Sequence, residues 1–159
     1  MNTVDPVLKD VESMTVAFML MKGNYNQIPA SFGKLYTWIT ENGYKPTGPA
    51  LSVYFNIPGQ VPDDELMWEL RSRVSEDVSE IEANDEGLGI KRLCPDYVAS
   101  VMYKGPYEKV EETYASLAQW IESNNYQVSG PPQELYYNSP EEVPSNELLT
   151  EIRFPVVKK

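Results

Sequence analysis

The chain has 159 residues, of which 42% are apolar and 23% are charged, a balance typical of folded rather than disordered proteins. Its formal net charge of -11 disfavours binding to nucleic acids, because a phosphate backbone is held by lysine and arginine. Histidine is absent, which excludes Ser-His-Asp and Cys-His nucleophile systems and the usual zinc sites. We therefore expect neither a metal nor a cofactor, and any chemistry must use carboxylates, tyrosines, lysines or the one thiol.

The expected location is the cytoplasm. Cys94 is the only cysteine, which excludes an internal disulfide and fits a reducing compartment. The longest apolar run covers residues 16–21, far short of the roughly 20 residues that span a bilayer. The first residues do not have the pattern of a signal peptide. We expect a soluble protein with no membrane partner.

In the first half of the chain, the pattern predicts a short strand, a longer strand, a helix and two further strands. The run at 16–21 ends at Lys22-Gly23 and is too short for a buried helix, so it is predicted as a strand. Apolar residues at helical spacing predict the helix, and Gly43 is a natural stop. The five elements are expected at about 7–11, 16–21, 26–42, 51–55 and 66–74.

The same order of elements follows after an acidic segment at 75–86, which is interpreted as a solvated connector. A strand at 98–103 and a helix at about 108–124 precede two strands, the first carrying Tyr136 and the second Glu151. Residues 16–74 align with residues 98–156 at a constant offset of 82, without a gap and with 22 identities in 59 positions. Chance would give about three or four identities, so the chain contains an internal duplication.

The duplication predicts an α+β fold built from two tandem strand-helix-strand-strand repeats. We expect a single domain over 1–159, with the repeats at about 5–77 and 88–159 joined by the acidic linker. One repeat alone would leave a sheet edge open and bury little, so the repeats are expected to form one antiparallel sheet with a pseudo-two-fold axis. Helices would cover one face, leaving the other for a ligand groove.

Alternation along the strands predicts which residues face that groove. In the last strand of each repeat, Glu69 and Glu151 lie opposite an apolar row, and Trp68 belongs to the core side. In the preceding strand of the first repeat, the apolar row Leu51, Val53 and Phe55 is expected to face the helices. The residues expected on the open face are Glu69, Glu151, Tyr54, Tyr136, Phe18, Leu20, Ser100 and Met102.

Two interpretations of the glutamates are open at this point. The simpler one is that Glu69 and Glu151 are solvated and pair with Arg71 or Arg153. The functional one is a groove with aromatic walls and central carboxylates, which suits flat, apolar, cationic or polarisable molecules. Cys94 has no evident activating neighbour and is interpreted as inert.

The second repeat carries a recognisable combination of motifs. These are Val98-Ala-Ser-Val-Met-Tyr-Lys-Gly-Pro-Tyr107, then Trp120-Ile121, Gly130-Pro131 and Glu134-Leu-Tyr-Tyr-Asn138, and finally Glu147-Leu-Leu-Thr-Glu-Ile-Arg-Phe-Pro-Val156. This pattern closely resembles the GyrI-like small-molecule-binding family, which is related to the effector-binding domains of AraC-type and MerR-type multidrug regulators. The first repeat matches less well, with Asn24 in place of proline and Ser72-Arg73-Val74 in place of the closing Phe-Pro-Val.

The resemblance implies a stand-alone multidrug-binding protein. Its ligands would be hydrophobic, often cationic or polyaromatic molecules, bound by Glu151 with Glu69, Tyr54, Tyr136, Phe18 and Met102. It also implies two alternatives. One is a hydrolase that opens cyclopropane-containing DNA-alkylating compounds, with Glu151 and Tyr136 as catalytic residues; the other is a protein that inhibits DNA gyrase. The repeats leave no room for a helix-turn-helix, so a DNA-binding regulator is not expected.

Overall fold

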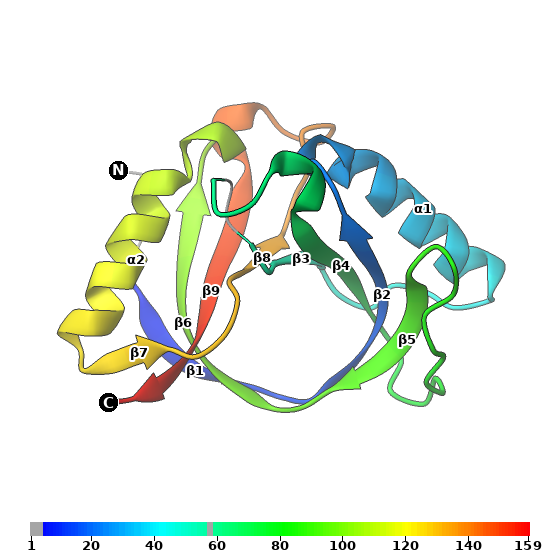
Figure 1. Cartoon of the computed structure of the whole chain (residues 1–159), viewed down its shortest axis with the longest axis horizontal. Helices are drawn as coiled ribbons and strands as arrows, with labels where there is room; N and C mark the ends of the chain where they lie inside the picture. Colours follow the sequence, from blue (N-terminus) through cyan, green and yellow to red (C-terminus); the bar gives the residue numbers. More distant parts are fainter. Residues whose placement is uncertain (1–4, 57–58) are drawn as a thin grey trace. The chain divides into compact units, whose positions relative to one another are not determined.

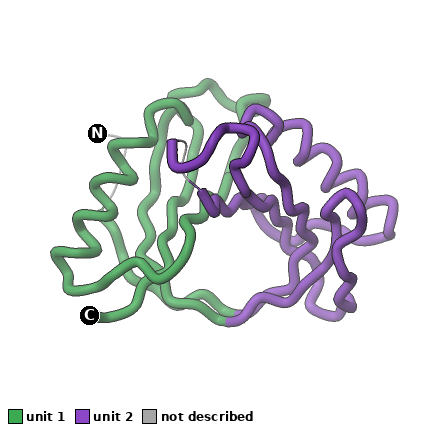
Figure 2. The backbone as a smooth tube through the Cα atoms, viewed as in Figure 1, with its two compact units in different colours: residues 1–12, 95–159 green, residues 13–94 purple. Residues whose placement is uncertain are grey.

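The computed structural model describes residues 5–56 and 59–159, which form two compact units. Unit 1 comprises residues 1–12 and 95–159, and unit 2 comprises residues 13–94 (Figure 2). The chain therefore begins in unit 1, passes through the whole of unit 2 and returns to unit 1. All pairings of strands within each unit are antiparallel, and the predicted α+β class is confirmed.

Unit 2 contains a four-stranded sheet in the order β3-β4-β2-β5, with one α-helix packed on it (Figure 1). Its elements are β2 (Met14–Lys22), a 3-10 turn (Tyr25–Gln27), α1 (Ile28–Glu41), β3 (Ala50–Tyr54), a 3-10 turn (Asp63–Glu65), β4 (Met67–Val74) and β5 (Leu88–Leu93). The predicted helix and the three predicted strands of this repeat are confirmed to within a few residues. β5, which follows the acidic segment, was not predicted.

Unit 1 has the equivalent order β1-β6-β9-β8, and the short strand β7 also pairs with β9. Its elements are β1 (Val7–Val11), β6 (Asp96–Lys104), a 3-10 turn (Tyr107–Lys109), α2 (Glu111–Ser123), β7 (Tyr126–Val128), β8 (Gln133–Tyr136), a 3-10 turn (Ser145–Glu147) and β9 (Leu149–Lys158). None of the helices in the described part of the chain is long and apolar enough to cross a membrane.

The first strand of each repeat pairs with a strand of the other repeat. β1 opens the first repeat but pairs with β6, whereas β5 opens the second repeat but pairs with β2. The two strands are equivalent, because an offset of 82 residues places Val7–Val11 on positions 89–93. The compact units thus differ in extent from the sequence repeats. The strand order of each unit contains four strands, whereas the predicted strand-helix-strand-strand repeat contains three.

Each helix covers one face of its own sheet, because the helix and the strands bury matching apolar residues. In unit 2, Leu35 and Ile39 of α1 pack with Trp68 and Leu70 of β4. In unit 1, the equivalent residues Leu117 and Ile121 pack with Ile152. All are almost inaccessible to solvent, and complete burial of a side chain of this size contributes roughly 1.5–3 kcal/mol. Trp68 belongs to the core, as predicted.

Gly87 occupies a backbone position that only glycine fits, just before β5. Its φ is +80°, and a Cβ atom there would lie 2.3 Å from the carbonyl oxygen of Leu20. Gly43 also has a φ of +80°, but nothing lies within 4 Å of its hypothetical Cβ atom. The two glycines therefore share the backbone requirement and differ in the space around them.

We expect Gly87→Ala to destabilise the protein much more than Gly43→Ala. The strain of a positive φ costs about 1–2 kcal/mol in both variants, and the clash with Leu20 should bring the loss in Gly87→Ala to about 3 kcal/mol or more. Urea denaturation of both variants measures the difference. Equal losses of stability would contradict the close approach of the backbone around Gly87.

Candidate functional site

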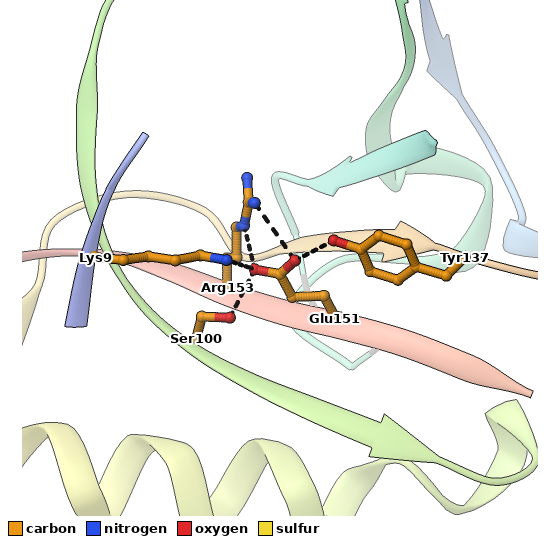
Figure 3. Close-up of polar contacts among 5 residues, drawn as sticks. All are labelled: Lys9, Ser100, Tyr137, Glu151 and Arg153. Carbon is orange, nitrogen blue, oxygen red and sulfur yellow. Dashed lines mark hydrogen bonds and ion pairs between the residues drawn. The ribbon is translucent and has the colours of Figure 1, made fainter. Parts of the chain in front are cut away.

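The strongest polar cluster of unit 1 surrounds the carboxylate of Glu151 on the sheet face opposite α2 (Figure 3). Glu151 Oε2 receives hydrogen bonds from Ser100 Oγ at 2.7 Å and from Arg153 Nε at 2.6 Å, and it pairs with Lys9 Nζ at 2.6 Å. The hydroxyl of Tyr137 donates to Oε1, which also accepts from Arg153 Nη2 at 3.4 Å. Lys9 and Tyr137 approach the carboxylate from opposite sides.

Glu151 is a buried charge that is stabilised by its hydrogen bonds. Only 1% of the residue is accessible to solvent. Burial by itself would raise the pKa of Glu151, but the donors Arg153, Lys9, Tyr137 and Ser100 outweigh it and lower the pKa to about 2. Glu151 is therefore ionised at neutral pH. Burial and the neighbouring carboxylate raise the pKa of Tyr137 to about 12, so its hydroxyl keeps its proton and donates.

Unit 2 contains a second buried carboxylate, Glu69, which is 3% accessible. Its Oε1 pairs with Arg71 Nε at 2.6 Å and with Lys91 Nζ at 2.8 Å, and its Oε2 accepts from Lys91 at 2.9 Å. The ammonium of Lys91 also lies 4.5 Å from the centroid of the Phe18 ring, a distance typical of a cation–π contact.

The two clusters are equivalent in the duplication. An offset of 82 residues relates Glu69 to Glu151, Arg71 to Arg153 and Lys91 to Lys9, so both units contain the same lysine-glutamate-arginine set. The other two donors of the Glu151 cluster have apolar equivalents. Ser100 corresponds to Phe18 and Tyr137 corresponds to Phe55, and neither phenylalanine can donate to Glu69. The cluster in unit 1 is thus the more polar of the two.

The pairing register tests the predicted faces, because directly opposite residues point to the same side of an antiparallel pair. Met102 lies opposite Glu151, Leu20 lies opposite Glu69, and Phe18 lies opposite Arg71. The predicted placement of Phe18, Leu20 and Met102 on the helix-free face is therefore confirmed. The role of Phe18, Met102 and both glutamates in ligand binding stays a prediction.

The predicted placement of Tyr54 and Tyr136 on that face is wrong. Tyr54 lies opposite the core residue Trp68, and Tyr136 lies opposite Thr150, so both tyrosines are on the helix side. The row Leu51, Val53 and Phe55 had been assigned to the helices because it is apolar, but Val53 lies opposite Glu69. Apolar side chains thus lie beside the carboxylates on their own face of the sheet. Hydrophobicity alone therefore assigned this strand to the wrong side.

Both tyrosines instead contact aromatic residues that precede the helices. Tyr54 packs edge-to-face on Tyr25 with ring centroids 5.1 Å apart, and Tyr136 does the same on Tyr107 at 5.7 Å. The hydroxyl of Tyr136 donates to Glu134 Oε1 at 2.8 Å. The predicted catalytic pair of Glu151 and Tyr136 is therefore not assembled, since the two residues lie on opposite faces of the sheet.

Sequence reasoning missed Tyr137, Lys9 and Lys91. Tyr137 follows the last residue of β8, and alternation places it on the face of Leu135, which lies opposite Glu151. The lysines could have been found by extending the repeat toward the N-terminus, where Lys9 and Lys91 are identical at the same offset. The alternative that the glutamates are solvated is also wrong, although their predicted pairing with Arg71 and Arg153 is correct.

Comparison with known proteins identifies the class of domain. The family described as the GyrI-like small molecule binding domain matches residues 5–157. The chain therefore belongs to the GyrI-like small molecule binding domain family. Over 154 residues, it is 26% identical to a protein of Erwinia billingiae (strain Eb661) named DNA gyrase inhibitor, and the similarity covers 96% of each chain.

Solved structures with the same fold include EcmrR in complex with DNA, with a TM-score of 0.84, 21% identity and coverage of 100% of this chain. This chain spans 59% of that EcmrR chain. The isolated EcmrR C-terminal domain has a TM-score of 0.80 and 22% identity, with 98% of both chains covered. SAV2435 bound to tetraphenylphosphonium has a TM-score of 0.58 and 17% identity, over 97% of this chain and 94% of that one. At identities of 17–22%, these structures show that the fold is shared, and they do not by themselves assign a ligand.

Acid denaturation should reveal the charge of Glu151. Since the pKa of Glu151 is lowered to about 2 from its usual 4.5, its ionised form stabilises the fold above the usual pKa, and this contribution is lost as the pH falls from about 4.5 to 2. Over that interval, the stability advantage of the wild type over Glu151→Gln should shrink by about 3 kcal/mol, measured by urea denaturation. Glu141→Gln, on an exposed turn, controls for the loss of one negative charge. Parallel pH profiles of wild type and Glu151→Gln would refute the lowered pKa.

Proposed function

We propose that this chain binds hydrophobic and polyaromatic small molecules, including cationic ones, in a groove on the helix-free face centred on Glu151, and that it does so in the cytoplasm. The observation that carries the proposal is the buried carboxylate of Glu151, which accepts a hydrogen bond from the hydroxyl of the partly exposed Tyr137. A buried, hydrogen-bonded charge with aromatic and apolar side chains on the same face is a feature of ligand sites in which a few polar groups fix the orientation of the ligand.

The surroundings of Glu151 support an apolar ligand. Tyr137 is 45% exposed although its hydroxyl is engaged, so part of this aromatic residue is available to a flat molecule. Met102, half-buried, lies directly opposite Glu151 on the neighbouring strand, and methionine adapts its shape to different partners. SAV2435, a structural relative, binds tetraphenylphosphonium, which is a polyaromatic cation.

The chemistry of the cluster favours binding over the predicted hydrolase activity. A general base works best when its pKa is near the working pH, and the pKa of Glu151 is lowered to about 2 by its four donors. Tyr137, which replaces Tyr136 as the partner of Glu151, has a pKa of about 12 and is a weak acid. A carboxylate and a phenol in these states hold a ligand better than they transfer protons.

We expect Tyr137→Ala to weaken the binding of a neutral polyaromatic probe such as pyrenebutanol about fivefold, because one aromatic contact is worth about 1 kcal/mol. Tyr137→Phe, which keeps the ring, should remain within about twofold of the wild type. The three tryptophans all belong to or pack against the helix-side cores, so their fluorescence is not expected to report binding on the helix-free face. The fluorescence anisotropy of the probe is therefore the suitable measurement.

Val157→Ala is the matched control, because it removes a similarly exposed apolar side chain six residues beyond Glu151 on the same strand. It should leave the affinity unchanged. Absence of saturable binding by the wild type, or equal affinities of wild type and Tyr137→Ala, would refute the proposal.

A gyrase-directed role is a second candidate, favoured by the relative named DNA gyrase inhibitor that matches over 96% of its length. In that case the chain, with a formal net charge of -11, should inhibit supercoiling by purified gyrase, and raising the salt concentration should weaken the inhibition. Glu151→Gln should inhibit equally well if this role uses the acidic surface rather than the buried carboxylate. No inhibition at a tenfold molar excess of the chain would exclude this candidate.

A further inference from the structure

Each buried glutamate is already paired with two cations. Glu151 contacts Lys9 and Arg153, each at 2.6 Å, and Glu69 contacts Arg71 at 2.6 Å and Lys91 at 2.8 Å. One negative and two positive formal charges leave each cluster with a net charge of +1. The carboxylate at the centre of the proposed site is therefore not an uncompensated negative charge that awaits a ligand cation.

Lys9 is the more exposed of the two cationic partners of Glu151. The side chain of Lys9 is 38% exposed, whereas those of Arg153 and Glu151 are 11% and 2% exposed. Arg153 comes from the same strand as Glu151, but Lys9 comes from β1, which ends the strand order of unit 1. A molecule that approaches Glu151 from the side of β1 therefore meets the ammonium group of Lys9 before it meets the carboxylate (Figure 3).

Unit 2 contains the same arrangement of a more exposed lysine and a less exposed arginine around its glutamate, which supports a specific role for the lysine. The side chain of Lys91 is 33% exposed, that of Arg71 is 12% exposed, and Lys91 comes from β5, the equivalent end strand. Other positions in the clusters differ between the repeats, with serine or tyrosine exchanged for phenylalanine. The lysine-glutamate-arginine set is identical in both.

We propose that Lys9 sets the charge preference of the Glu151 site by acting as an internal counter-ion that competes with cationic ligands. This inference rests on the proposed binding function and specifies its ligand class. The preferred ligand has an apolar aromatic body and an acidic or neutral hydrogen-bond-accepting group that meets the Lys9 ammonium. A cation of the same shape must displace Lys9 from Glu151 Oε2 or remain near a cluster that is already positive.

The overall charge of the chain does not reverse this preference. A net charge of -11 attracts cations from a distance, but salt screens exposed charges beyond about 8 Å at physiological ionic strength. Within that distance, Lys9 is the more exposed of the two cations that contact Glu151, with its ammonium 2.6 Å from the carboxylate. Local charge therefore determines the order of affinities, and the net charge affects the rate of encounter.

The test uses three pyrene probes that share a four-carbon chain and end in a carboxylate, a hydroxyl or a trimethylammonium group. The wild type should bind the carboxylate at least about fivefold more tightly than the ammonium. In Lys9→Met, the affinity for the carboxylate probe should fall about tenfold and the affinity for the ammonium probe should rise about tenfold. The order of the two affinities should therefore reverse. The neutral probe should change by less than about twofold, because its binding depends on the aromatic contacts.

Two further variants make the outcome specific. Lys34→Met removes the same charge from an exposed position on α1 and should leave all three affinities unchanged. Lys9→Arg keeps a cation and should retain the order of the wild type; circular dichroism confirms that each variant is folded. Tighter binding of the ammonium probe by the wild type, or a parallel shift of both charged probes in Lys9→Met, would overturn the role of Lys9. If no probe binds the wild type, the proposed binding function itself fails.

Discussion

The burial of an ionised carboxylate is the constraint on which much of unit 1 depends. A buried charge without partners is so unfavourable that it is rarely tolerated, so Glu151 requires donors from several parts of the chain. Arg153 comes from its own strand, Ser100 from β6, Tyr137 from the end of β8 and Lys9 from β1. The cluster therefore couples the position of four segments to one side chain, including the first strand of the chain.

The reciprocal position of the two end strands follows the same logic. β1 pairs with β6 and β5 pairs with β2, so each unit receives its lysine from the first strand of the repeat that forms the rest of the other unit. In this arrangement the neutralisation of each glutamate depends on the chain passing from one unit to the other and back. A single repeat would lack the exposed cation of its own cluster.

The duplication has preserved charge and varied polarity. Both clusters keep lysine, glutamate and arginine, whereas Ser100 and Tyr137 in unit 1 are replaced by Phe18 and Phe55 in unit 2. Glu151 thus receives two neutral donors in addition to its cations, and Lys91 has an aromatic ring beneath it instead. Two clusters of common origin therefore hold the same formal charge but differ in the side chains that accompany it.

The sequence by itself determined the duplication, because that follows from identity at a fixed offset. Local periodicity determined the α+β class, the two helices, most strands and the apolar row of each last strand that faces the helix. It also identified Glu69 and Glu151 and their arginine partners, which lie two residues apart on one strand face. Only the tertiary structure decided that Tyr137 rather than Tyr136 joins Glu151, and that Lys9 and Lys91 complete the clusters. Alternation relates residues within one strand, but the register between strands is a long-range property, and an error of one residue moves every side chain to the other face.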